Sequence, residues 1–150
     1  METIKRFSKT VFSTLGAGFN ERVYHNSLEV LLKKHNIPFK TEQVIPVMFE
    51  GCEVGQVRAD LVIRGNLVVE LKVSNSIKND HSTQCFMYMK LLKINEGIII
   101  NFPKSDGEDV EFYEQKLVED EDENVCSRCD REGHTYDKCY AKRDVNGNML

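Results

Sequence analysis

The spacing of apolar residues predicts three helices in the chain. Apolar positions recur at helical intervals over residues 2–14 and 20–35, and the asparagine that begins the second segment can cap a helix. A third helix is expected from a cap at Asp80 or Ser82 to about Lys93. Each helix has one apolar side and therefore needs a partner surface to cover it.

Alternating or continuous apolar runs predict strands between and after these helices. The expected order of elements is ααβββαββ, which indicates an α/β or α+β fold with a mixed sheet flanked by helices. The strand that follows the third helix is apolar except for Asn101 and is expected in the centre of the sheet. The predicted strands cover residues 39–49, 53–63, 67–73, 97–102 and 110–117.

The stretch over residues 59–73 carries charges inside two apolar runs that flank an Arg-Gly-Asn turn, a pattern typical of a β-hairpin. Side chains alternate along a strand, so Glu70 and Lys72 share one face. If the loop comprises residues 64–66, Asp60 lies directly opposite Glu70, about 5 Å away at Cβ. Their repulsion would cost about 3 kcal/mol at an effective dielectric of about 20. A bound divalent cation would remove that repulsion.

Two other interpretations of the hairpin remain open. A two-residue Gly65-Asn66 loop would pair Asp60 with Leu71 and place the two acids on opposite faces. A metal site therefore requires the three-residue loop, or a bulge that again places Asp60 and Glu70 on the same face. Alternatively, the two acids line a solvated sheet face on which Lys72 screens them.

Composition and charge describe an ordinary globular chain with an uneven charge distribution. Its 150 residues are 41% hydrophobic and 29% charged, enough for one core and a small appendage. Residues 106–123 hold ten acids and one base, so the rest of the chain is mildly basic, too weakly for tight, purely electrostatic duplex binding. We expect a main domain over residues 1–117, an acidic linker over 118–124 and a small separate domain with its tail over 125–150.

The expected location is intracellular, in the cytoplasm or nucleus, with no membrane association. No apolar run approaches the roughly 20 residues of a membrane span, and the first residues lack the apolar region of a signal peptide. Three of the five cysteines cluster with a histidine near the end of the chain. This spacing is typical of a metal site rather than a disulfide framework, which favours a reducing compartment.

The stretch from Leu15 to Tyr24 resembles the signature of the GxxExxY proteins, a branch of the PD-(D/E)xK nuclease superfamily, through Gly18, Glu21 and Tyr24. The resemblance covers about two thirds of the chain, in order. It departs from the superfamily at Ala59, where a proline often stands. The further matching segments are Arg58-Ala-Asp60, Val69-Glu-Leu-Lys72, His81-x-x-Gln84-x-x-x-Tyr88 and Gly97-Ile-Ile-Ile-Asn-Phe102.

This resemblance implies a restriction-endonuclease-like core with a Mg²⁺ or Mn²⁺ site. By similarity, Asp60 and Glu70 would hold the ion, and the backbone carbonyl of Leu71 would add a third oxygen. Glu21 would reach the same site from its helix, directly or through water. Oxygen ligands of this kind suit hard divalent cations.

The resemblance also implies roles for three further polar residues. Lys72 would orient the attacking water and stabilise charge that develops on the phosphate. Gln84 and Tyr88 are similar to a Gln-x-x-x-Tyr element that positions the phosphate or the nucleophile. Without the resemblance, Lys72 could simply be a charge partner of Glu70, Gln84 an exposed helix residue and Tyr88 a core aromatic.

The pattern Cys126-x-x-Cys129-x-x-x-x-His134-x-x-x-x-Cys139 resembles a CCHC zinc knuckle. Three thiolates and one imidazole form a closed tetrahedral set for structural Zn²⁺, and Gly133 suits the tight turn of that motif. So short a segment cannot fold by hydrophobic burial alone, so zinc would supply its stability.

Zinc knuckles bind single-stranded nucleic acid by stacking a base on an aromatic residue. Ser127 replaces the usual aromatic residue after the first cysteine, so Tyr136 or Tyr140 would have to provide the stacking surface. This departure also leaves open a knuckle that binds protein. The basic residues placed to contact phosphates are Arg128, Arg131, Lys138, Lys142 and Arg143.

Together these features predict a metal-dependent nuclease that hydrolyses phosphodiester bonds of DNA or RNA. The knuckle would recruit single-stranded or structured nucleic acid. The alternative is a non-catalytic nucleic-acid-binding adaptor built on an inactive nuclease fold. A third possibility is a module that binds only proteins.

Overall fold

The computed structural model describes residues 1–117, and the four predicted zinc ligands lie outside them. The predicted order ααβββαββ is confirmed. The helices are α1 (Glu2–Leu15), α2 (Glu21–Lys34) and α3 (Asn79–Leu92). The strands are β1 (Phe39–Phe49), β2 (Cys52–Ile63), β3 (Leu67–Val73), β4 (Glu96–Phe102) and β5 (Glu111–Lys116).

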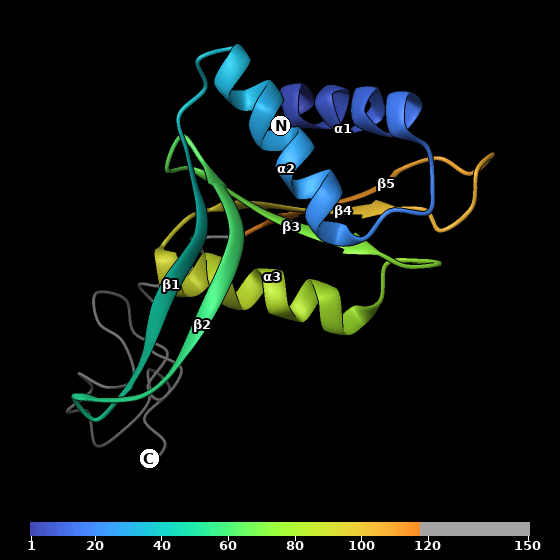
Figure 1. Cartoon of the computed structure of the whole chain (residues 1–150). Helices are drawn as coiled ribbons and strands as arrows, with labels where there is room; N and C mark the ends of the chain where they lie inside the picture. Colours follow the sequence, from blue (N-terminus) through green and yellow to red (C-terminus); the bar gives the residue numbers. More distant parts are fainter. Residues whose placement is uncertain (118–150) are drawn as a thin grey trace, which may run out of the picture. The chain divides into compact units, whose positions relative to one another are not determined.

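The five strands form one mixed sheet in the order β1-β2-β3-β4-β5. Only β3 and β4 run parallel, because α3 connects them as a crossover helix, and the other neighbours are antiparallel. Helices α1 and α2 cover one face of the sheet and α3 covers the other (Figure 1). The predicted α/β sandwich with a mixed sheet is thus observed.

Two apolar cores fill the spaces between these layers. One lies under α1 and α2 and includes Val69 and Leu71 of β3, with Val73 packed against it. The other lies under α3 and includes Val68. Both faces of β3 are therefore covered, as is usual for a central strand.

Helix α3 approaches the sheet closely at Gly97 of β4. A Cβ atom at this glycine would lie 2.5 Å from the Sδ atom of Met89 and 3.0 Å from the Sγ atom of Cys85. The missing side chain thus lets α3 pack directly on the sheet.

The start of α3 differs from the prediction. The helix begins at Asn79 with Lys78 as its N-cap, rather than with Asp80 or Ser82. The imidazole Nδ1 of His81 accepts a hydrogen bond from the backbone N–H of Lys78 at 3.2 Å. A histidine ring thus performs the role that Glu or Gln usually has in a capping box, and the pattern used for the prediction could not show this.

The loop before α2 is held by the aromatic residue of the Gly-x-x-Glu-x-x-Tyr motif. The Tyr24 hydroxyl donates a hydrogen bond to the Gly16 carbonyl at 2.7 Å, and its buried ring stacks on Phe102 of β4 with centroids 4.3 Å apart. Gly18 has a φ of +103°, which favours glycine. The motif therefore fixes where α2 begins and where Glu21, in its first turn, is placed.

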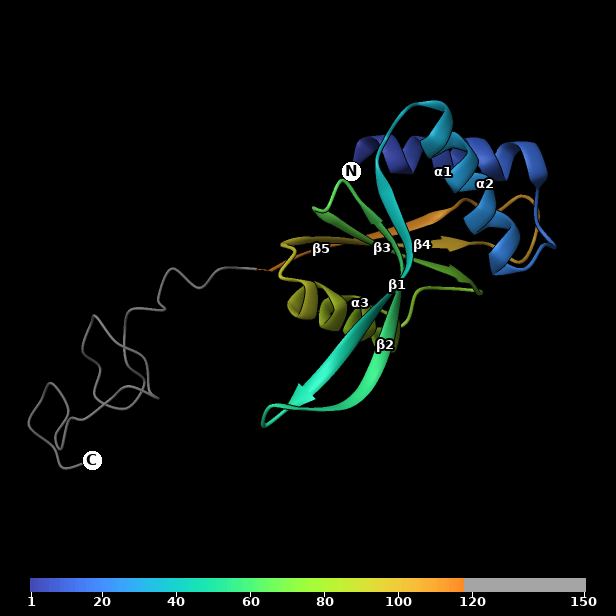
Figure 2. The same ribbon diagram turned by 60° about the vertical axis from the view of Figure 1, so that its left-hand side comes forward.

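Strands β1 and β2 bend at Asp60 and continue away from the sheet as a two-stranded ribbon. Ala59 and Leu61 are two residues apart yet pack in different cores, so β2 changes face between them. Opposite this point, Glu42 of β1 has a left-handed φ of +48° and forms an ion pair with Arg22 of α2. Beyond the bend, the ribbon projects past α3, as both views show (Figures 1 and 2).

Over residues 1–117, no helix is long and apolar enough to cross a membrane.

Candidate active site

The β2–β3 turn has the length that places the two predicted acids opposite each other. Ile63 pairs with Leu67, so the loop comprises the three residues 64–66, as predicted. The last regular pair of this ladder is Leu61 with Val69, and the next two residues in register are Asp60 and Glu70. The two-residue loop considered above is therefore excluded.

Beyond that pair, carboxylates replace the backbone ladder between the two strands. The Asp60 N–H donates a hydrogen bond to Glu70 Oε1 at 3.2 Å, and the Leu71 N–H donates one to Asp60 Oδ2 at 2.9 Å. Each side chain thus accepts a hydrogen bond from the opposite strand. Within residues 1–117, the second oxygen of each carboxylate, Asp60 Oδ1 or Glu70 Oε2, makes no hydrogen bond with protein.

Glu70 is nearly inaccessible, with 2% of its surface exposed. Burial, and then the negative charge of Asp60, raise the pKa of Glu70 to about 9. The N–H of Asp60 and the charge of Lys72 oppose this rise. The positive charge near Asp60 and Glu70 is therefore too small to keep both carboxyl groups ionised. A divalent cation would supply the missing positive charge.

Glu21 lies half-buried in the first turn of α2 and is electrostatically coupled to the acid pair. Its pKa is raised by burial and then by the charge of Asp60, while Lys72 and His25 lower it. Over residues 1–117, however, no three His, Cys, Asp or Glu side chains are gathered closely enough to hold a metal ion. The structure thus brings Asp60 and Glu70 together and leaves Glu21 outside a three-residue ligand group.

Lys72, Gln84 and Tyr88 form a chain of hydrogen bonds beside the acid pair. The Lys72 ammonium donates to Gln84 Oε1 at 3.1 Å, and Gln84 Nε2 donates to the Tyr88 hydroxyl at 3.0 Å. Burial, and then the charge of Glu70, raise the pKa of Tyr88, so its hydroxyl stays protonated. Gln84 is therefore not a free surface residue, and Tyr88 combines a core ring with a polar contact.

Asn101 supports the loop that leaves the site, although its role was not predicted. Its buried amide oxygen accepts hydrogen bonds from the N–H and hydroxyl groups of Ser74, and its amide nitrogen donates to Ser74 O and Glu111 Oε1. These contacts fix the chain just after Lys72. The signal in the sequence is a polar residue inside the apolar run of β4.

His25 joins α2 to β1, a role that was not predicted from the sequence. It is buried on α2, and its Nε2 atom lies 2.8 Å from Thr41 Oγ1 and 3.3 Å from Glu29 Oε1. The spacing of Glu21, His25 and Glu29, four residues apart, places the three on one side of α2. This spacing was the one sign in the sequence that His25 lies on the same side of the helix as Glu21.

Residues 1–112 match the family model of the PD-(D/E)XK nuclease superfamily, and the chain belongs to that superfamily. Among solved structures, it is similar to the crystal structure of SSO0001, with 28% sequence identity and a TM-score of 0.49. The alignment covers 63% of this chain and 48% of that one, so the matched region spans about half the length of SSO0001. No curated protein matches the chain.

Proposed function

We propose that residues 1–117 form a metal-dependent nuclease that hydrolyses phosphodiester bonds of DNA or RNA, and that the chain belongs to the GxxExxY branch of its superfamily. The observation that carries the proposal is the pairing of Asp60 with Glu70. Two carboxylates meet across a strand gap beside a lysine, and each has one oxygen that accepts no hydrogen bond from residues 1–117. Phosphodiester hydrolysis needs charge stabilisation and an activated water, and this group of side chains supports both.

Asp60 and Glu70 would hold Mg²⁺ or Mn²⁺, with the Leu71 carbonyl as a further ligand and Glu21 acting through a water molecule. The donor set fits, because it is made of hard oxygens and carries a negative charge that protein groups leave only partly neutralised. When bound, the ion would polarise the phosphate and lower the pKa of a bound water.

Lys72 would donate hydrogen bonds to the phosphate oxygens as negative charge develops there. Its ammonium is held in place by Gln84, which is held in turn by Tyr88. Gln84 and Tyr88 thus act as positioning residues for Lys72, and both lie on α3, which packs rigidly on the sheet. Such support lets a flexible lysine act without losing much conformational entropy during the reaction.

We also propose that Cys126, Cys129, His134 and Cys139 hold a structural Zn²⁺ and form a knuckle that recruits single-stranded nucleic acid. Their spacing supports this, since it provides a complete tetrahedral set of soft and borderline ligands. Base stacking on Tyr136 and phosphate contacts would provide affinity. The basic residues proposed for these contacts are Arg128, Arg131 and Lys138.

The test is cleavage of labelled single-stranded DNA, RNA and flap substrates by the full chain with Mn²⁺. We expect cleavage to fall about 100-fold or more in Glu70→Gln, because the substitution removes a metal ligand and its charge. Glu108→Gln is the matched control, since this exposed acid lies in the β4–β5 loop and should leave cleavage unchanged.

Absence of cutting by the wild-type chain at every Mn²⁺ concentration, with substrate retention unaffected by Glu70→Gln, would contradict the nuclease proposal. That result would favour the adaptor instead.

A further inference from the structure

The end of the β1–β2 ribbon is an exposed apolar surface that carries only negative charge. We define the ribbon tip as residues 48–54. Within it Met48, Phe49 and Val54 have 56%, 66% and 62% of their surfaces exposed. Its two charged residues, Glu50 and Glu53, form no ion pair within residues 1–117.

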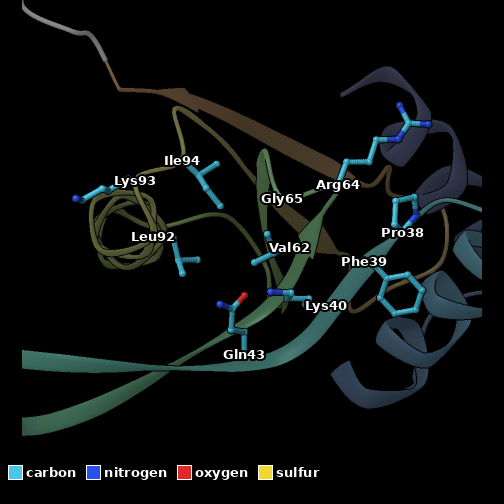
Figure 3. A pocket seen from close by; sticks show the side chains of 10 residues that line it. All are labelled: Pro38, Phe39, Lys40, Gln43, Val62, Arg64, Gly65, Leu92, Lys93 and Ile94. Carbon is cyan, nitrogen blue, oxygen red and sulfur yellow. The ribbon is translucent and has the colours of Figure 1, made fainter.

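The base of the same ribbon borders a hollow of opposite charge, between the β2–β3 turn and the end of α3 (Figure 3). The basal hollow has a volume of about 720 Å³, and the residues from 1–117 that line it include three cations and no acid. Lys93 and Arg64 lie on opposite sides of it, as Figure 3 shows. The cations are Lys40, Arg64 and Lys93, and none forms an ion pair within residues 1–117. The apolar lining includes Phe39, Val62, Leu92 and Ile94.

The ribbon tip and the basal hollow are complementary in charge, but the tip of one chain cannot reach the hollow of the same chain. Gln43 is the last residue of β1 in the lining of the hollow, and the extended strand from there to Met48 at the tip spans about 17 Å at ~3.3 Å per residue. Two copies related by a two-fold axis, with their ribbons side by side and antiparallel, would place each tip at the other copy's hollow. Such a dimer contains the tip-to-hollow contact twice, related by the two-fold axis, and leaves no tip or hollow for a third copy.

We propose that the occupant of the basal hollow is the ribbon tip of a second copy of this chain, so that two chains form a symmetric dimer through their ribbons. The apolar tip side chains would cover the apolar lining, and Glu50 and Glu53 would face the cations. Among residues 1–117, strand β1 is an edge of the sheet, which leaves the ribbon accessible to a second copy. Pro46 lacks a backbone N–H, so it prevents a continuous ladder between two β1 strands and favours contact through side chains.

Charge also argues against nucleic acid as the partner of the tip, because Glu50 and Glu53 have no cationic partner within residues 1–117 and would repel phosphates. The proposal does not depend on nuclease activity, since neither surface includes a residue of the candidate active site.

The test exchanges charges between the two surfaces of the full chain, under reducing conditions because Cys52 is exposed at the tip. Analytical ultracentrifugation should give twice the mass of one chain for the wild type. Glu50→Lys/Glu53→Lys and Arg64→Glu/Lys93→Glu should each raise the dimer dissociation constant about 100-fold or more, because like charges then meet at both contacts. Mixing the two variants should restore dimers, since each tip then faces a hollow of opposite charge.

Matched controls reverse equal numbers of exposed charges elsewhere. Glu108→Lys/Asp109→Lys and Arg6→Glu/Lys9→Glu should remain dimeric, and circular dichroism should show that all variants are folded. A wild-type chain that stays monomeric at every concentration would overturn the proposal. Hollow variants that lose nucleic-acid retention but keep the wild-type mass would also overturn it and assign the hollow to phosphates. Failure of the variant mixture to form dimers would exclude the tip-to-hollow contact.

Discussion

At the scale of single residues, the candidate site depends on a buried acid that is protonated in the metal-free protein. Burial and the charge of Asp60 raise the pKa of Glu70 to about 9, from 4.5 in the free side chain. Both states of the chain hold this proton below pH 4.5. Between pH 4.5 and 9 the unfolded chain has released it and the folded chain retains it, so folding takes up a proton.

The free energy of unfolding should therefore decrease as the pH rises through this window, by at most about 1.4 kcal/mol per pH unit from Glu70. We expect the decrease to be smaller in Glu70→Gln, which cannot ionise. Urea unfolding at pH 5.5, 7 and 8.5, without Mg²⁺ or Mn²⁺, measures the difference between the two slopes. Equal slopes would mean that Glu70 is ionised in the folded protein.

At the scale of elements, the helix that carries Glu21 is positioned by the tyrosine of its own motif. The Tyr24 hydroxyl bonds to Gly16 O across the loop before α2, while its ring stacks on Phe102. The two residues of the motif therefore differ in what they do: Glu21 is electrostatically coupled to Asp60, and Tyr24 fixes the start of the helix.

Tyr24→Phe should lower the free energy of unfolding by about 1 kcal/mol, because it removes one partly buried hydrogen bond and keeps the ring. Cleavage should fall as well, since the first turn of α2 and Glu21 lose an anchor. Thermal unfolding and the cleavage assay measure the two effects. Tyr113→Phe, at an exposed position of β5, is the matched control and should change neither. Cleavage that stays at the wild-type rate would restrict Tyr24 to a structural role.

The elements that were predictable from the sequence are those fixed by local apolar patterns. The apolar runs on either side of residues 64–66 predicted the β2–β3 hairpin but left its loop length open, and the spacing of Glu70 and Lys72 gave their common face. Contacts between distant segments were not predictable in this way. The amide of Asn101 joins β4 to Ser74 through a strand order that no local pattern encodes.

Backbone conformation explains the other differences. Opposite the bend at Asp60, Glu42 has a left-handed φ, and glutamate is a residue type that gives little indication of such a conformation. The earlier start of α3 depends on an imidazole acting as a cap. Glu42 and His81 thus adopt roles that their local sequence does not favour. The packing of the whole sheet and its helices stabilises them.

At the scale of the whole molecule, an acidic segment separates two mildly basic regions of the sequence. Residues 119–123 are five consecutive acids. An acidic stretch next to basic surfaces can compete with phosphates for them, and this would limit non-specific binding to nucleic acid.

Replacing Glu119–Glu123 with five glycine and serine residues should therefore raise the affinity for single-stranded DNA at low salt, with a smaller effect at high salt where charges are screened. Fluorescence anisotropy at two ionic strengths measures this. Because the replacement keeps the length of the segment, a change in spacing cannot explain the result. Equal affinities of the wild type and the variant for single-stranded DNA at low salt would exclude competition by the acidic segment.

The three-residue turn between β2 and β3 also affects how this protein can change in evolution. Both sides of β3 bury apolar residues, among them Val68 and Val69, so a strand slipped by one position would still offer hydrophobic side chains to either layer. A change in this turn that moved the partner of Ile63 from Leu67 to a neighbouring residue would thus separate Asp60 from Glu70 while a folded chain survives. Folded relatives that keep the acid pair and folded relatives that lose it could then differ in this turn alone.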